Sequence, residues 1–255
     1  MEEQVDRLVK KAWARYQDTP RSKRLMIAVS GIPGSGRDVA ELLREEISHA
    51  DGDYRKDDVG CEGIATFLPM DGYHLTREQL SAMPDPHTAH FRRGAAFTFD
   101  APAFLELVKK LREPLCAETA TIYAPSFDHA VKDPVADDIP IAATSRVVVM
   151  EGNYLSLGSG APEWKEAAEL MDELWFVEVD EDVARQRLTK RHVASGIVAN
   201  EDEGRRRADE TDLVNGREIV EGRLKVDEVI HSREDDGWKP EQQGIDKERD
   251  GKKEA

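Results

Sequence analysis

The sequence predicts an α/β fold in which helices cover both faces of a mainly parallel sheet. Short apolar runs typical of buried strands alternate with stretches of helical periodicity. Three of these runs end in glycine or in an acidic residue followed by glycine. In open sheets of this kind, ligands bind at the carboxyl ends of the strands. The 255 residues, 39% of them hydrophobic, are enough for one core and one such domain.

The first elements are a helix, a strand and a second helix. Apolar residues recur at helical spacing from Val5 to Tyr16, so residues 1–20 are predicted to form an amphipathic helix that packs on the domain. Residues 25–29 are predicted to form a buried strand, and residues 37–49 a helix. The glycine-rich segment between that strand and that helix is therefore a strand-to-helix loop.

The rest of the domain continues the alternation up to about residue 235. After a polar connection, the further predicted elements are a strand at 64–70, a helix around 104–111, strands at 146–150 and 174–179, a polar helical region at 180–223 and a short strand at 226–230. Residues from His231 onward are strongly polar, and 236–255 are predicted to be a disordered tail. The polar stretch 51–60 is expected to be a solvated connection.

The composition limits the classes of partner that we expect for the protein. The net charge of −16 opposes nonspecific attraction to nucleic acid and to anionic membranes. No apolar run approaches the roughly 20 residues needed to cross a bilayer. The two cysteines have no metal-type spacing, and the segment after Met1 does not resemble a secretory signal. We therefore expect a cytoplasmic protein that acts on a small molecule rather than on nucleic acid or a membrane.

The segment Gly31-Ile-Pro-Gly-Ser-Gly-Arg37-Asp38 is close to a phosphate-binding loop. The pattern G-x-x-x-x-G-K-[S/T] is matched at both outer glycines. Such a loop turns backbone N–H groups toward a phosphate, and the following helix adds its positive N-terminal end. The candidate nucleotide-binding residues are Gly31, Gly34, Ser35, Gly36, Arg37, Asp38 and Val39.

Two positions depart from the pattern. Arg37 keeps the positive charge of the usual lysine, but its planar fork makes the exchange non-conservative. Asp38 replaces the hydroxyl that ligates Mg²⁺; a carboxylate is a good ligand for a hard cation and repels phosphate without one. The alternative is that the segment is only a turn, with Asp38 stabilising the first turn of the helix.

The region 181–223 is rich in arginine and is predicted to form a helical lid. Arg187 and Arg191 are about one helical turn apart, so both can lie on one face and meet phosphates when the lid closes. A pair of solvated surface helices is the alternative.

Five segments in this order resemble the P-loop kinases of the phosphoribulokinase, uridine kinase and bacterial pantothenate kinase group, especially its nucleoside kinase-like branch of bacteria and fungi. Besides the loop, they are Leu68-Pro-Met-Asp-Gly-Tyr-His-Leu75, Arg92-Arg93-Gly-Ala-Ala-Phe-Thr-Phe-Asp100, Tyr123-Ala-Pro-Ser-Phe-Asp-His129 and Val149-Met-Glu-Gly-Asn-Tyr154. Arg191-His192 and Thr211-Asp-Leu-Val-Asn-Gly216 resemble its lid region, so the likeness covers roughly residues 20–235. It implies a P-loop NTPase fold with three α/β/α layers.

The resemblance also implies roles for single residues. Asp71 matches the catalytic acid, and Arg37, Arg187 and Arg191 the cations that act on phosphate. Glu151 matches the position that contacts Mg²⁺ directly or through water, and Asp38, which departs from the family pattern, would replace the loop hydroxyl as a metal ligand. The implied acceptor site consists of Asp71, His74, Arg92, Arg93, Tyr123, Phe127 and His129. Taken alone, Asp71 could be a turn cap before Gly72, the histidines structural residues, and Arg92 and Arg93 exposed charges.

The expected activity is transfer of the γ-phosphoryl group of Mg-ATP to a hydroxyl of a nucleoside-, sugar- or pantothenate-like acceptor. The alternative is a kinase-like fold that acts as a nucleotide-binding or regulatory module, because Arg37 and Asp38 replace the two side chains with the most direct phosphate and metal contacts. A homodimer is left open.

Overall fold

The computed structural model describes residues 2–35, 38–50 and 63–232, with the backbone only at residues 2, 38, 49 and 50. Its central sheet has the strand order β2-β5-β1-β6-β7, and all neighbouring strands are parallel. The strands are β1 (Leu25–Gly31), β2 (Ala65–Pro69), β5 (Val147–Glu151), β6 (Glu173–Glu178) and β7 (Glu228–His231). The predicted parallel sheet is confirmed.

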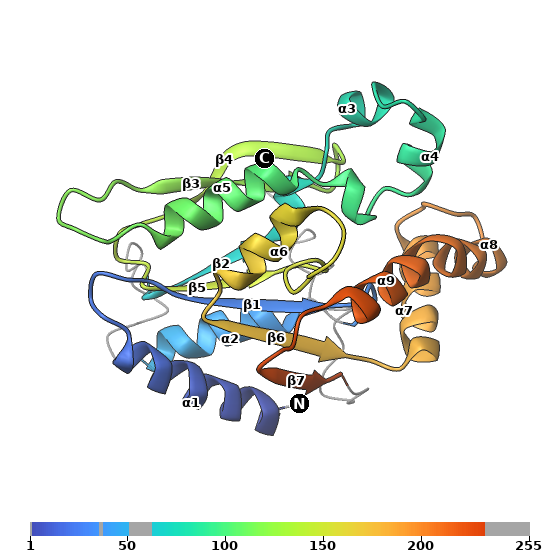
Figure 1. The fold of residues 1–255 in the computed structure, drawn as a ribbon. Coiled ribbons are helices and arrows are strands. Elements are labelled where there is room, and N and C mark those ends of the chain that lie inside the picture. The colour runs from blue at the N-terminus through green and yellow to red at the C-terminus, as the bar shows by residue number, and fades with distance from the viewer. Residues whose placement is uncertain (1, 36–37, 51–62, 233–255) are drawn as a thin grey trace, which may run out of the picture.

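Helices cover both faces of this sheet, as Figure 1 shows. One face carries α1 (Glu2–Asp18) and α2 (Asp38–Ala50), and the other carries α5 (Ala101–Arg112) and α6 (Pro162–Glu169). The three-layer α/β/α architecture predicted from the sequence is therefore confirmed, and the first helix packs on the domain as expected.

Alternation along the central strands separates two cores. On β1, Leu25, Ile27 and Val29 face α1 and α2, whereas Met26 and Ala28 face α5 and α6. Strand β5 alternates in the same way, and all of these side chains are buried. Because successive side chains of a strand point to opposite faces, a strand buried on both sides reads as one continuous apolar run.

The helical region after β6 lies at the carboxyl ends of the strands (Figure 1). It consists of α7 (Glu181–Ala194), α8 (Glu201–Arg207), the π-helical segment η3 (Ala208–Asp212) and α9 (Leu213–Gly222). Strand β7 then continues to His231, which was expected to begin the polar tail, because its backbone pairs with β6 at Glu178. The predicted connection 51–60 and tail 236–255 lie outside the described residues.

An antiparallel hairpin is the main element that we did not predict. It consists of β3 (Ile122–Asp128) and β4 (Asp133–Ile141). Strand β4 carries three aspartates and two prolines and has one buried residue, so it lacks an apolar run. The short elements before it are the 3-10 helices η1 (Met70–Tyr73) and η2 (Ala96–Thr98) and the helices α3 (Arg77–Ser81) and α4 (Pro86–Phe91).

Across the described ranges 2–35, 38–50 and 63–232, each helix is too short or too polar to span a bilayer.

Candidate functional site

The carboxyl ends of three central strands meet at one edge of the sheet. In the β-ladder, Glu151 at the end of β5 stands opposite Val29 of β1 and Pro69 of β2. The amide of Gly152 donates a hydrogen bond to the carbonyl of Val29, with an N–O distance of 3.2 Å. The loop after β1, Asp71 after β2 and Glu151 after β5 therefore lie along the same edge.

The described part of the predicted phosphate loop is tightly packed. The amide of Ser35 donates to the carbonyl of Ile32 at 3.0 Å, which closes a turn, and Gly34 adopts a φ of +86°. A side chain at Gly34 would lie 3.0 Å from the carbonyl oxygen of Ala184 in α7. Gly36, Arg37 and the side chain of Asp38 lie outside the described residues, while Val39, in the first turn of α2, is buried.

Asp71 lies in η1, directly after β2, with 23% of its side chain exposed. Two glycines position this segment by allowing close contacts. A side chain at Gly152 would overlap Met70, and one at Gly72 would overlap the backbone of Pro125 in β3. Gly72 is thus required by its contact with the hairpin. The segment that carries Asp71 is therefore packed between the end of β5 and β3. Glu151, at that end of β5, is half-buried.

A group of aromatic and imidazole rings lies next to Asp71. Nδ1 of His74 is 2.9 Å from the backbone oxygen of Asp71, and its ring centroid is 4.0 Å from that of Phe99 and 4.9 Å from that of Phe127. The ring of His129 is 5.2 Å from Phe127. The four ring residues come from three segments of the chain that only the fold brings together: His74, Phe99, and Phe127 with His129.

The adjacent arginines Arg92 and Arg93 have different partners. Arg93 donates to the carbonyls of Leu75 and Lys132 and to the carboxylate of Asp133, at 2.6 to 3.0 Å, and its guanidinium stands over Phe127. Arg92 donates at 2.8 Å to the amide oxygen of Asn215 in α9. Both side chains are largely buried, which distinguishes them from ordinary exposed charges. Tyr123, also predicted for this site, is 53% exposed on β3.

The lid approaches the phosphate loop through Arg187. Its Nη1 donates to the carbonyl of Gly34 at 3.1 Å and to the hydroxyl of Ser232 at 2.9 Å. This contact is direct, so α7 is more than a solvated surface helix. The charge of Arg191, also in α7, lowers the pKa of Asp212.

Asp212 belongs to a buried pair that we did not predict. Its Oδ2 lies 2.8 Å from Nε2 of His192, which is 5% exposed, and also accepts a bond from the hydroxyl of Thr211. Burial acts to raise the pKa of Asp212, but the bond from His192 and the charge of Arg191 outweigh it and lower the pKa. The sequence offered one signal, because these residues belong to the two lid motifs.

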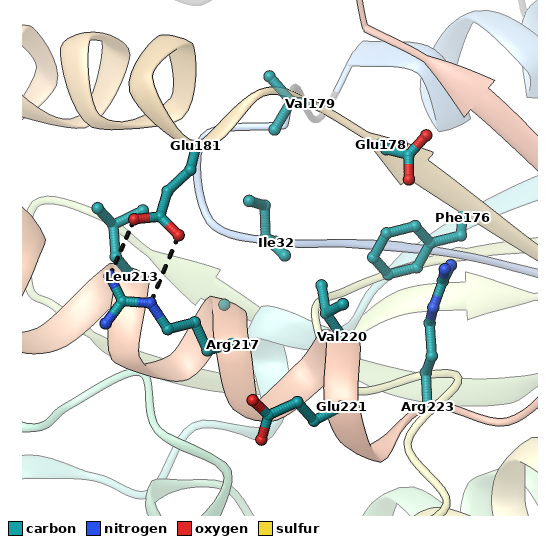
Figure 2. Close-up of a pocket in the computed structure, with 11 residues that line it drawn as sticks. Ile32, Phe176, Glu178, Val179, Glu181, Leu213, Arg217, Val220, Glu221 and Arg223 are labelled. Carbon is teal, nitrogen blue, oxygen red and sulfur yellow. Dashed lines mark hydrogen bonds and ion pairs between the residues drawn. The ribbon is translucent and has the colours of Figure 1, made fainter.

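A pocket of about 280 Å³ lies beside the phosphate loop (Figure 2). Ile32, Phe176 and Val220 form apolar walls, and the ion pair of Glu181 with Arg217 crosses one side. The guanidinium of Arg223 stacks on Phe176, 4.1 Å from its ring centroid. The pocket thus lies between the end of β6 and α9, and neither Asp71 nor Glu151 lines it.

Known proteins resemble the chain over most of its length. It is 56% identical over 161 residues to the ATP-dependent kinase-like protein notR' of Aspergillus versicolor, covering 63% of this chain and 92% of that protein. It is 37% identical over 209 residues to the Schizosaccharomyces pombe protein named "Putative uridine kinase", covering 82% of this chain and 83% of that one. No protein-family profile matches the chain.

Among solved structures, YFH7 of Saccharomyces cerevisiae, described as "a putative P-loop containing kinase with a circular permutation", superposes with a TM-score of 0.76. The two are 26% identical, and the match covers 91% of this chain and 99% of that one. This match supports the three-layer fold described above.

Proposed function

Because the chain belongs to the uridine kinase-like P-loop kinases, we propose that it transfers the γ-phosphoryl group of Mg-ATP to a hydroxyl of a nucleoside-, sugar- or pantothenate-like acceptor. The single observation that carries this proposal is the register of the central strands, which aligns the loop after β1, Asp71 and Glu151 at one edge. Phosphoryl transfer needs a phosphate cradle, a group that orients the acceptor hydroxyl and neutralisation of charge.

In this proposal the loop from Gly31 to Asp38 binds the phosphates through its backbone amides. Asp71 accepts a hydrogen bond from the acceptor hydroxyl, holds it in line with the γ-phosphorus and takes its proton as the new P–O bond forms. The bond from the γ-phosphorus to the bridging oxygen breaks, and ADP leaves. Arg187 and Arg191 offset negative charge as the lid closes, and closure excludes water that would otherwise compete with the acceptor.

The oxygen donors present suit Mg²⁺. The described residues contain no group of three or more side chains of the kind that would hold a metal ion by themselves. Mg²⁺ in nucleotide sites is usually held by one or two carboxylates together with phosphate oxygens and water, and Glu151, with Asp38, would supply the carboxylates. Bound there, the ion would neutralise the charge of the phosphates.

The acceptor would bind against the rings next to Asp71. His74 and Phe127 present flat faces, and His129 extends that wall. Tyr123 lies at its exposed end, while Arg92 and Arg93 offer guanidinium groups to oxygen atoms of the acceptor. Arg93 already has three acceptors, so its main contribution would be to hold Phe127 and the hairpin in place.

The loop sequence supports a second candidate function. Arg37 and Asp38 replace the lysine and the hydroxyl of the usual pattern, and a loop that no longer binds Mg-ATP would leave a kinase-like binding or regulatory module. The two functions differ in nucleotide affinity, which can be measured before any acceptor is identified.

The deciding experiment is calorimetric titration with ATP, with and without Mg²⁺, for the wild type and the double variant Arg37→Lys/Asp38→Ser. Mg²⁺-dependent binding by the wild type supports the kinase and justifies an assay of ADP release with uridine, ribose and pantothenate. Binding that appears only in the double variant contradicts the kinase and supports the regulatory module.

A further inference from the structure

One face of the segment from η3 into α9 contacts three parts of the kinase. Asp212 pairs with His192 of α7, and Asn215 accepts a hydrogen bond from Arg92, the residue that follows α4. Gly216 packs on Ile32 of the phosphate loop. Residues three and four apart lie on the same face of a helix. A Cβ at Gly216 would lie 3.3 Å from Cβ of Ile32, so this helix rests directly on the loop.

Asn215 is buried, and its side-chain amide is hydrogen-bonded to Arg92. It is 3% exposed, and its Oδ1 accepts from Nη2 of Arg92 at 2.8 Å, although the two residues are 123 positions apart. Arginine can only donate, so the oxygen of the amide must face it. A buried amide without a partner destabilises a protein, so the pair is strongly favoured once both groups are enclosed.

Arg92 depends on this bond far more than Arg93 depends on any single partner. Its charged partner, Glu218, is 3.7 Å away and is 56% exposed, so water weakens that attraction. Nε of Arg92 is buried and has no hydrogen-bond partner among the described residues. The orientation of the guanidinium is therefore determined mainly by Asn215.

We propose that Asn215 is a positioning residue for the acceptor: it orients Arg92 so that the remaining donors of the guanidinium meet an oxygen atom of the bound acceptor. This rests on the proposed function, in which Arg92 contacts the acceptor. The neighbouring contact of Gly216 with Ile32 means that the same helix face reaches the nucleotide loop, so acceptor and nucleotide are aligned from one rigid element.

The test compares Asn215→Leu, which keeps the size of the side chain but removes its oxygen, with Asn215→Asp, which keeps an oxygen in the same place. With whichever of uridine, ribose and pantothenate the wild type phosphorylates, Asn215→Leu should raise the KM for the acceptor about tenfold, the usual effect of losing a hydrogen bond to a charged group. The KM for Mg-ATP should stay unchanged, and Asn215→Asp should restore most of the acceptor KM.

A double-mutant cycle shows whether Asn215 acts through Arg92. In an Arg92→Gln background, Asn215→Leu should add little further loss, because the group that it positions is already absent. Arg217→Gln is the matched control, since it removes an exposed ion pair two residues further along α9. An equal rise of the acceptor KM in Arg217→Gln, or full additivity in the cycle, would overturn the proposal.

Hydrogen exchange provides a readout that needs no acceptor. Asn215→Leu should speed amide exchange in residues 92–98, and Asn215→Asp and Arg217→Gln should not. Unchanged exchange in that segment overturns the proposal even if the protein is an active kinase. Conversely, faster exchange in a protein that phosphorylates none of the three acceptors supports the positioning contact, while the proposed function fails separately.

Discussion

Arg187 in α7 donates a hydrogen bond to the carbonyl oxygen of Gly34 in the phosphate loop, 153 positions earlier in the chain. The same Nη1 also reaches the hydroxyl of Ser232 after β7. One side chain thus joins the lid, the loop and the last strand of the sheet. This bond adds to the packing of Gly34 against Ala184 and Leu188, so α7 contacts the loop both through its surface and through Arg187.

Replacing Arg187 should weaken nucleotide binding. Arg187→Met keeps a long apolar side chain but removes a positive charge and the bond to Gly34, so we expect the Kd for Mg-ATP to rise about tenfold in calorimetry. Lys190→Met removes a charge from the exposed side of the same helix and should leave the Kd within about twofold. Equal losses in the two variants would mean that only the net charge of the helix matters.

Replacing Asp71 should impair transfer without impairing nucleotide binding. Asn has nearly the same shape but cannot take a proton, so Asp71→Asn should lower kcat by about 10²–10⁴-fold. The Kd for Mg-ATP and the melting temperature should stay close to those of the wild type. Asp71 follows β2, and β5 separates that strand from β1 and its loop. Retention of wild-type kcat in the ADP-release assay would remove Asp71 from the mechanism.

Arg24 should be important for stability at the opposite end of β1. It is 2% exposed and donates to the backbone carbonyls of Ser145, Leu111 and Ala142. Arg24→Met would remove these three hydrogen bonds, although the carbonyl of Ala142 would keep the bond from the amide of Ser145, and we expect the free energy of unfolding in urea to fall by about 3 kcal/mol. Arg21→Met changes an exposed arginine nearby and should have little effect; a similar loss there would contradict this account.

The largely buried carboxylate of Asp212 should make the free energy of unfolding depend on pH in the acid range. Its pKa in the folded protein is lowered despite burial, because His192 bonds to it and Arg191 is nearby. A lowered pKa stabilises the folded state above the unfolded pKa of about 4, and this contribution is lost as the pH falls through the folded value. Between pH 7 and pH 3, urea unfolding of the wild type should therefore lose more stability than that of Asp212→Asn. Parallel curves for the two proteins would contradict the prediction.

Buried strands were the easiest elements to predict from the sequence. The strands β1, β5 and β6 are covered on both faces, and such strands consist of apolar residues without interruption. The hairpin of β3 and β4 was missed because most of its side chains are partly exposed and its register shifts between Ala124 and Ser126. Its position depends on contacts with η1 that have no local signal.

The candidate site was predictable only in part, for the same reason. Asp71 and Glu151 follow strands, so the sequence places them at strand ends, and parallel topology brings those ends together. The bond between Arg92 and Asn215 and the pair of His192 with Asp212 join distant segments. Such pairings depend on how the lid packs at the carboxyl ends of the strands, which the periodicity of a single helix does not encode.

The packing of the folded protein requires a glycine at position 34. Its positive φ and its contact with Ala184 and Leu188 would disfavour any side chain, whether or not a phosphate is bound. A relative that does not transfer a phosphoryl group would still need glycine there in order to dock α7. Preservation of Gly34 among relatives would therefore indicate that they share the docking of the lid, and would not by itself indicate that they bind a nucleotide.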